Sequence, residues 1–179
     1  MFSKSSAIFI TPLISLYFLA ASQVVYSDDA SALIDRARSA APSLVSEDAT
    51  IMYRGEVLVE GKNKWICMPE TFPDDNMPMC NDAIWMQMMK AVGEKAPFSS
   101  SVFGFSYMLE GDGGVSNSDP YHPDHMSADD YIKEGPHLMI IVPREMLKGI
   151  TDDPHAGGPY VMWKDTPYAH IMVPLGDRE

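Results

Sequence analysis

Two prolines bound the stretch that decides the fold, Gly135-Pro136-His137-Leu138-Met139-Ile140-Ile141-Val142-Pro143. Its centre, His137 to Val142, is a continuous apolar run. Such a run, short and flanked by residues that interrupt strands, is typical of a central strand buried on both faces of a sheet. We therefore expect this segment to lie in the middle of the domain.

A second stretch has a similar order of residue types, Thr166-Pro167-Tyr168-Ala169-His170-Ile171-Met172-Val173-Pro174. Each copy carries His and Met within an apolar run that ends in Val-Pro. Residues two apart on a strand point to the same face. His137 and Met139 should therefore share one face, and His170 and Met172 should share one face.

If the two strands are neighbours in register, two imidazoles and two thioethers converge. Thioether is a soft ligand and imidazole also accepts copper, so His137, Met139, His170 and Met172 predict a copper site, with Cu(I) favoured. The chain has 14 methionines, which fits this prediction. In the alternative interpretation the methionines fill the core and the histidines form local hydrogen bonds.

Length and composition favour one folded domain, because the chain has 179 residues of which 46% are hydrophobic. The formal net charge is −12. Nucleic acid as a partner is excluded by this charge, since phosphate binding needs clustered Lys and Arg. The same charge argues against docking on an anionic membrane.

The first residues resemble a secretory signal, with Lys4 before the apolar run Ala7–Leu19 and small residues after it. The run is shorter than the roughly 20 residues of a spanning helix, and Pro12 interrupts it. We predict a signal peptide over 1–27 and one exported domain over 28–179, in the periplasm or outside the cell, with no membrane anchor after cleavage. The alternative is an uncleaved anchor.

Cys67 and Cys80 are the only cysteines, and export would place them in an oxidising compartment. The segment between them contains three prolines and no hydrophobic periodicity. We therefore predict a Cys67–Cys80 disulfide. Free thiols and metal-bound thiolates are the alternatives.

The remaining patterns predict an α+β domain, mainly an antiparallel sheet with two or three helices on one face and long loops. Residues 50–53, 56–60 and 64–68 read as a small antiparallel meander, and further strands are expected at 101–109, 137–142, 160–164 and 168–173. Helices are expected at 30–41 and 81–90, a helical turn at 144–149 and a long loop at 110–130. The order of elements and the absence of a Gly-rich strand-to-helix turn exclude a Rossmann or P-loop domain.

Three further groups of residues have the composition of binding sites, and each also has an ordinary structural interpretation. His122 and His125 lie three residues apart among four aspartates and could bind zinc. Asp112-Gly113-Gly114 resembles a calcium loop in composition only. Trp163 and Tyr168 flank a predicted turn, where they form either a recognition surface or part of the core.

Five segments together resemble a family of exported bacterial proteins of unknown function. Besides the two Val-Pro stretches, they are Tyr107-Met108-Leu109 with Ser116-Asn117-Ser118-Asp119-Pro120, Gly157-Gly158-Pro159-Tyr160-Val161-Met162-Trp163-Lys164, and Trp65-Ile66-Cys67. The resemblance covers roughly residues 50 to 174. It implies export and a single domain, and it supplies no catalytic residue.

The sequence as a whole predicts a soluble, exported, non-enzymatic domain that binds a small ligand or a soft metal. One alternative is an enzyme that uses His155 or His137 as an acid or base in a pocket under the 110–130 loop. Another is a structural or interaction domain of the cell envelope.

Overall fold

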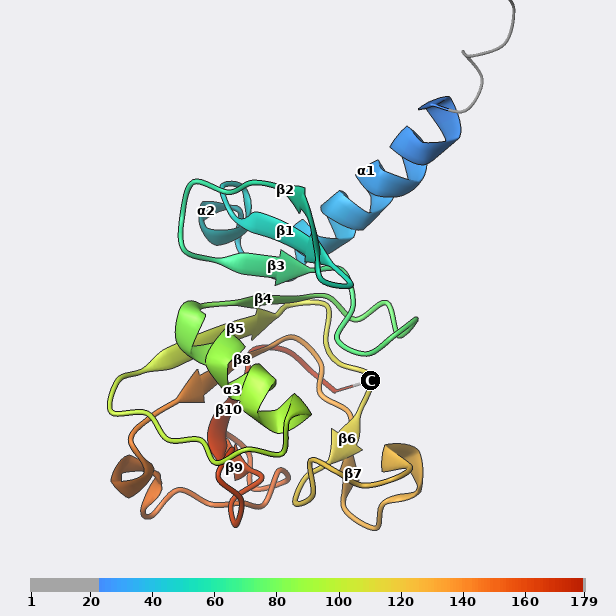
Figure 1. The fold of residues 1–179 in the computed structure, drawn as a ribbon. Coiled ribbons are helices and arrows are strands. Elements are labelled where there is room, and N and C mark those ends of the chain that lie inside the picture. Colours follow the sequence, from blue (N-terminus) through green and yellow to red (C-terminus); the bar gives the residue numbers. More distant parts are fainter. Residues whose placement is uncertain (1–22, 179) are drawn as a thin grey trace, which may run out of the picture.

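The computed structural model describes residues 23–178, whose central feature is an eight-stranded sheet (Figure 1). The helical elements are α1 (Gln23–Ser39), α2 (Ser43–Ser46), α3 (Ala83–Gly93), η1 (His125–Ser127) and η2 (Arg144–Leu147). The strands are β1 (Thr50–Tyr53), β2 (Glu56–Val59), β3 (Ile66–Met68), β4 (Met79–Asn81), β5 (Gly104–Met108), β6 (Val115–Ser116), β7 (Tyr131–Ile132), β8 (His137–Ile141), β9 (Tyr160–Met162) and β10 (His170–Pro174).

The strand order in the large sheet is β2-β1-β3-β4-β5-β8-β10-β9. All neighbours are antiparallel except β1 and β3, which are parallel. The predicted α+β fold with a mainly antiparallel sheet is therefore confirmed. The predicted meander over residues 50–68 is wrong in one connection, because the chain crosses over after β2 and places β3 beside β1.

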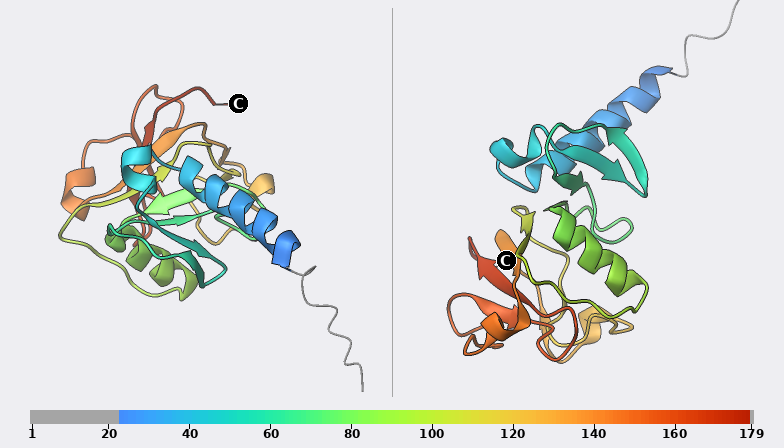
Figure 2. Two further views of the ribbon diagram at one scale, coloured as in Figure 1. Left: turned by 90° about the horizontal axis from the view of Figure 1, so that it is seen from above. Right: turned by 60° about the vertical axis from the view of Figure 1, so that its left-hand side comes forward.

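The two long helices cover opposite faces of the sheet, and not one face as predicted (Figure 2). On α3, Trp85 and Met88 pack in a cluster with Met79 of β4. On α1, Ala37 packs in a second cluster with Cys80, the next residue of β4. Since successive strand residues point to opposite faces, the two clusters lie on the two sides of the sheet.

Both helices differ from their predicted bounds at the ends. The Asp82 carboxylate accepts a hydrogen bond from the Trp85 amide at 2.8 Å and caps α3. The first long helix begins at Gln23 rather than at 30, so the predicted cleavage point after Ser27 falls within α1. The apolar run at 7–19 lies outside the described residues.

Strand β8 is buried on one face only, which corrects the expectation of burial on both. His137, Met139 and Ile141 are buried, whereas Leu138 and Ile140 are partly exposed. Helix α3 covers the first set, and α1 packs over the other end of the sheet. The apolar run therefore supplies one face of β8 that is buried in the core and one face that is only partly buried.

Two segments predicted to lack regular structure contain short strands. The 110–130 segment includes β6, which pairs with β7 in a separate two-stranded sheet. The segment between the cysteines ends in β4, which pairs with β3 and β5. Both strands have two or three residues, too few for a sequence pattern to reveal.

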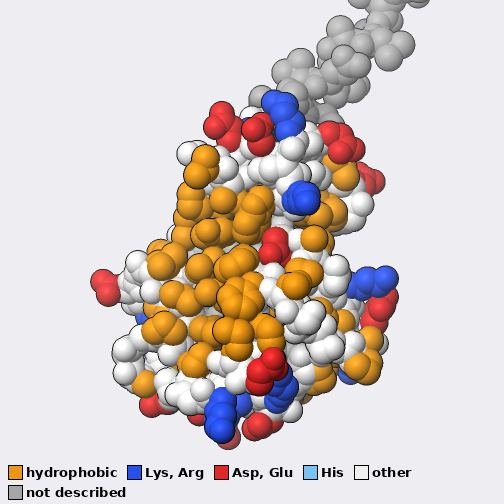
Figure 3. All heavy atoms as spheres, turned by 90° about the vertical axis from the view of Figure 1, so that its left-hand side faces the viewer, with side chains coloured by type: hydrophobic (Ala, Val, Ile, Leu, Met, Phe, Trp, Pro, Cys, Tyr) orange, Lys and Arg blue, Asp and Glu red, His pale blue; other side chains and the backbone are white. Residues whose placement is uncertain are grey.

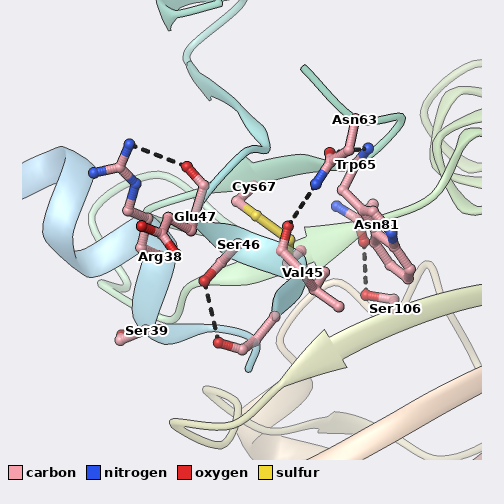
Figure 4. Close-up of a disulfide and its surroundings, with 12 residues drawn as sticks. Arg38, Ser39, Val45, Ser46, Glu47, Asn63, Trp65, Cys67, Asn81 and Ser106 are labelled. Carbon is pink, nitrogen blue, oxygen red and sulfur yellow. Dashed lines mark hydrogen bonds between the residues drawn. A yellow bond between two sulfur atoms is a disulfide. The ribbon is translucent and has the colours of Figure 1, made fainter. Parts of the chain in front are cut away.

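The predicted disulfide joins Cys67 of β3 to Cys80 directly opposite on β4. It packs in a cluster with Ala41, which lies between α1 and α2, and Figure 4 shows its surroundings. Nearby, the Asn63 side chain donates to the Val45 carbonyl at 2.9 Å. The disulfide therefore fixes the junction between the two ends of the sheet.

The end of the described chain is tied to the core through a buried carboxylate. Arg178 Nη2 donates to Glu134 at 2.6 Å, and the Tyr160 hydroxyl donates to the same oxygen at 2.8 Å. The Glu134 side chain is almost fully buried. Because a buried charge without partners is costly, Arg178 should contribute substantially to stability.

We expect Arg178→Met to lower the free energy of unfolding by about 3 kcal/mol, since it leaves the Glu134 charge uncompensated. Urea denaturation measures this loss. The control is Lys164→Met, which removes an exposed ion pair with Asp152 and should cost less than about 1 kcal/mol. Equal effects of the two variants would contradict this account of Glu134.

Candidate functional site: a methionine-lined cavity

The two similar stretches of sequence, 135–143 and 166–174, contain neighbouring antiparallel strands, β8 and β10. Met139 lies directly opposite Met172, and His137 lies opposite Pro174. The buried faces of both strands point into the same core, so the four predicted site residues share one side of the sheet.

The register separates the two imidazoles, however. His137 begins β8 and His170 begins the antiparallel strand β10, so they lie at opposite ends of the paired strands with the methionine pair between them. Four residues of strand correspond to about 13 Å. A single ion held by both imidazoles does not fit this register.

Each histidine instead has a methionine directly across from it on its other neighbour strand. His137 faces Met108 of β5, and His170 faces Met162 of β9. Side chains opposite each other in an antiparallel pair have Cβ atoms about 5 Å apart. The sheet therefore carries two separate His–Met pairs with Met139 and Met172 between them.

A cavity of about 280 Å³ lies between this face of the sheet, α3 and the segment that joins Cys67 to Cys80, called the cystine segment below. Seven of the chain's 14 methionines line it, namely Met79, Met88, Met89, Met108, Met139, Met162 and Met172. Trp85, Trp163 and His170 complete much of the remaining wall. The lining is therefore soft, polarisable and mainly apolar.

His170 is the histidine of this lining. Its Nδ1 lies 2.9 Å from the Tyr168 carbonyl oxygen, which can only accept, so Nδ1 carries the proton. Its Nε2 is buried without a hydrogen-bond partner. Burial lowers the pKa of His170 to about 4, since the charged form would be desolvated. At neutral pH, Nε2 is therefore unprotonated, and its lone pair accepts no hydrogen bond.

Two tryptophans enclose the His170 ring. Trp85 and Trp163 each meet it edge to face, with ring centroids 5.1 Å away. Trp163 has a positive φ of 54°, which is rare outside glycine. Its amide donates to Asn117 and its indole Nε1 to Ser116, which hold this conformation. The small β6–β7 sheet therefore positions one wall of the cavity.

The cystine segment supplies another wall through Thr71, Phe72 and Asp75. The Asp75 carboxylate accepts hydrogen bonds from the amides of Thr71, Phe72 and Met77. These bonds order a segment that has no hydrophobic periodicity of its own. Asp75 thus has a structural role at the rim.

The other candidate residues have local roles. Asp112 accepts from the amides of Gly114 and Glu134, and burial raises its pKa. Asp112 also lines the cavity. His155 is exposed on the loop before β9, and His137 is fully buried.

The zinc prediction at His122 and His125 finds no support. The two rings lie 6.1 Å apart, and His125 Nδ1 accepts from the Ser116 amide. Within residues 23–178, no group of three or more His, Cys, Asp or Glu side chains could hold a metal ion. Tyr168 is buried in the core, whereas Trp163 is partly buried and lines the cavity.

Apolar side chains also gather on one side of the surface (Figure 3). Exposed large apolar side chains of the described residues include Leu44 of α2, Val102 and Phe103 before β5, and Met146 of η2. Among the described residues, no helix is long and apolar enough to cross a membrane.

Comparison with known proteins gives no match to a family model, a curated protein or a solved structure. The resemblance to exported bacterial proteins of unknown function therefore stays a prediction.

Sequence reasoning found His170, Met139 and Met172 but missed the cavity. Six methionines of the sequence fall within residues 68–89, and three of them, Met79, Met88 and Met89, line the site. Trp85 and Met162 lacked a distinguishing pattern, because their contribution depends on strand order and helix placement.

The depressed pKa of His170 predicts a specific loss of stability in acid. Above the unfolded pKa near 6.5 both states are neutral, whereas towards pH 4 only the unfolded state takes up the proton. We expect this to destabilise the wild type by up to about 3 kcal/mol between pH 7 and pH 4, relative to His170→Phe. Urea unfolding of both proteins at the two pH values measures the difference, and parallel pH profiles would contradict it.

Proposed function

We propose that this domain is an exported, non-catalytic binding protein that holds a small, largely apolar ligand in the methionine-lined cavity. The observation that carries the proposal is the cavity itself, about 280 Å³ with seven methionines and two tryptophans in its wall. Flexible, polarisable side chains adapt to ligands of varied shape, as they do at other methionine-rich binding surfaces. The Cys67–Cys80 disulfide is in keeping with an oxidising compartment.

Binding is favoured over catalysis by the positions of the histidines. The enzyme alternative used His155 or His137, but neither lines the cavity. His170 does line it, and its orienting partner is an uncharged carbonyl. A general base is usually oriented by a charged group and must reach its substrate, so this arrangement favours binding.

The probe we choose is naphthalene, because a dry apolar cavity of about 150 Å³ accepts benzene and this one is larger. The methionine methyl groups can be labelled with carbon-13 and followed by NMR during titration. We expect saturable shifts of the cavity methyl groups, whereas Met126 and Met146, which are 79% and 50% exposed, stay unchanged.

A matched pair of variants tests the location. Val115 lines the cavity, so Val115→Phe should fill part of it and weaken naphthalene binding by about 10-fold or more. Val57 is exposed on β2, and Val57→Phe should bind as the wild type does. Absence of saturable shifts, or equal shifts at the exposed methyl groups, would overturn the proposed function.

A further inference from the structure

The Nε2 atom of His170 is a free ligand atom in an apolar setting. It is buried without a hydrogen-bond partner, and its ring is fixed by the bond from Nδ1 to the Tyr168 carbonyl. Buried polar atoms without partners are rare, because each costs desolvation free energy. A bond to an ion would satisfy this atom.

The sheet places two methionines next to His170 on the same buried face. Met162 is the direct cross-strand partner of His170, and Met172 is two residues along β10 on the same buried face. Met172 and Met162 both line the cavity together with His170. The long, flexible methionine side chain can bring sulfur to a neighbouring imidazole.

The donor set decides the kind of ion. A neutral imidazole nitrogen and two neutral thioether sulfurs are ligands for a soft, low-charge cation. Zinc and harder ions prefer thiolates, several imidazoles or carboxylates, and no cluster of three or more such side chains that could hold a metal ion occurs within the described residues. The rings of Trp85 and Trp163 flank His170 and exclude water from its surroundings.

We propose that His170 Nε2, Met162 Sδ and Met172 Sδ form a three-coordinate site for Cu(I). This set replaces the four residues predicted from sequence, because the register places His137 at the far end of the paired strands. Met139 lies across from Met172 and supports its position. The site occupies one wall of the cavity and does not depend on an organic ligand.

The test uses Cu(I) under a competing bathocuproine chelator, with Ag(I) as an air-stable soft ion and Zn(II) as the comparison. We expect the wild type to bind Cu(I) and Ag(I) and to bind Zn(II) at least about 10-fold more weakly. In carbon-13 methyl spectra, Ag(I) should shift Met162 and Met172, and it should leave the exposed Met126 unchanged.

Matched variants locate the site. Met162→Leu keeps the volume and removes one sulfur, so Cu(I) affinity should fall by about 10-fold or more. The control is Met79→Leu, which makes the same change in the same cavity on β4, three strands from β10, and should retain wild-type affinity. His170→Phe should abolish binding.

Unchanged Cu(I) affinity in Met162→Leu, or equal losses in Met162→Leu and Met79→Leu, would overturn this site. Lack of Cu(I) binding by the wild type would overturn it as well. Naphthalene binding is measured separately, so either proposal can fail while the other stands.

Discussion

The pairing of β8 with β10 is the constraint on which the rest of the structure depends. Once Met139 lies opposite Met172, the two histidines are forced to opposite ends of the pair. The same register points alternate residues of both strands at α3, whose Trp85 and Met88 complete the core. A shift of β10 by one residue would turn His170 and Met172 away from the cavity.

The sequence predicted these two strands, their shared chemistry and which residues of each share a face, since a two-residue period assigns side chains to faces. It did not predict that β8 is buried on one face only. It left open which residues meet across strands, because that depends on the long irregular connection between β8 and β10. The cavity was also beyond prediction from sequence. Its walls come from β4, α3, the cystine segment and Trp163, which only tertiary contacts bring together. The prediction that the helices all cover one face of the sheet was wrong for the same reason, since periodicity does not say which side of a sheet a helix covers.

Both buried histidines use Nδ1 to bond a backbone carbonyl and leave Nε2 without a partner. An apolar residue at either position would avoid the free-energy cost of burying a nitrogen without a hydrogen-bond partner. The difference between them lies in their surroundings, because His170 faces a methionine-lined space enclosed by two tryptophans, whereas His137 lies outside the cavity wall. Burial of the His170 Nε2 atom without a partner costs free energy of desolvation. A ligand bound in the cavity could recover that free energy by contacting this atom.

The two outermost strands, β2 and β9, are only four and three residues long. Unpaired amide and carbonyl groups at the margins of a sheet can recruit strands from other molecules. With so few such groups, and with Pro159 before β9 and the left-handed turn at Trp163 after it, little of the margin is open to extension. The margins of the eight-stranded sheet therefore offer few groups for pairing with a strand of another molecule.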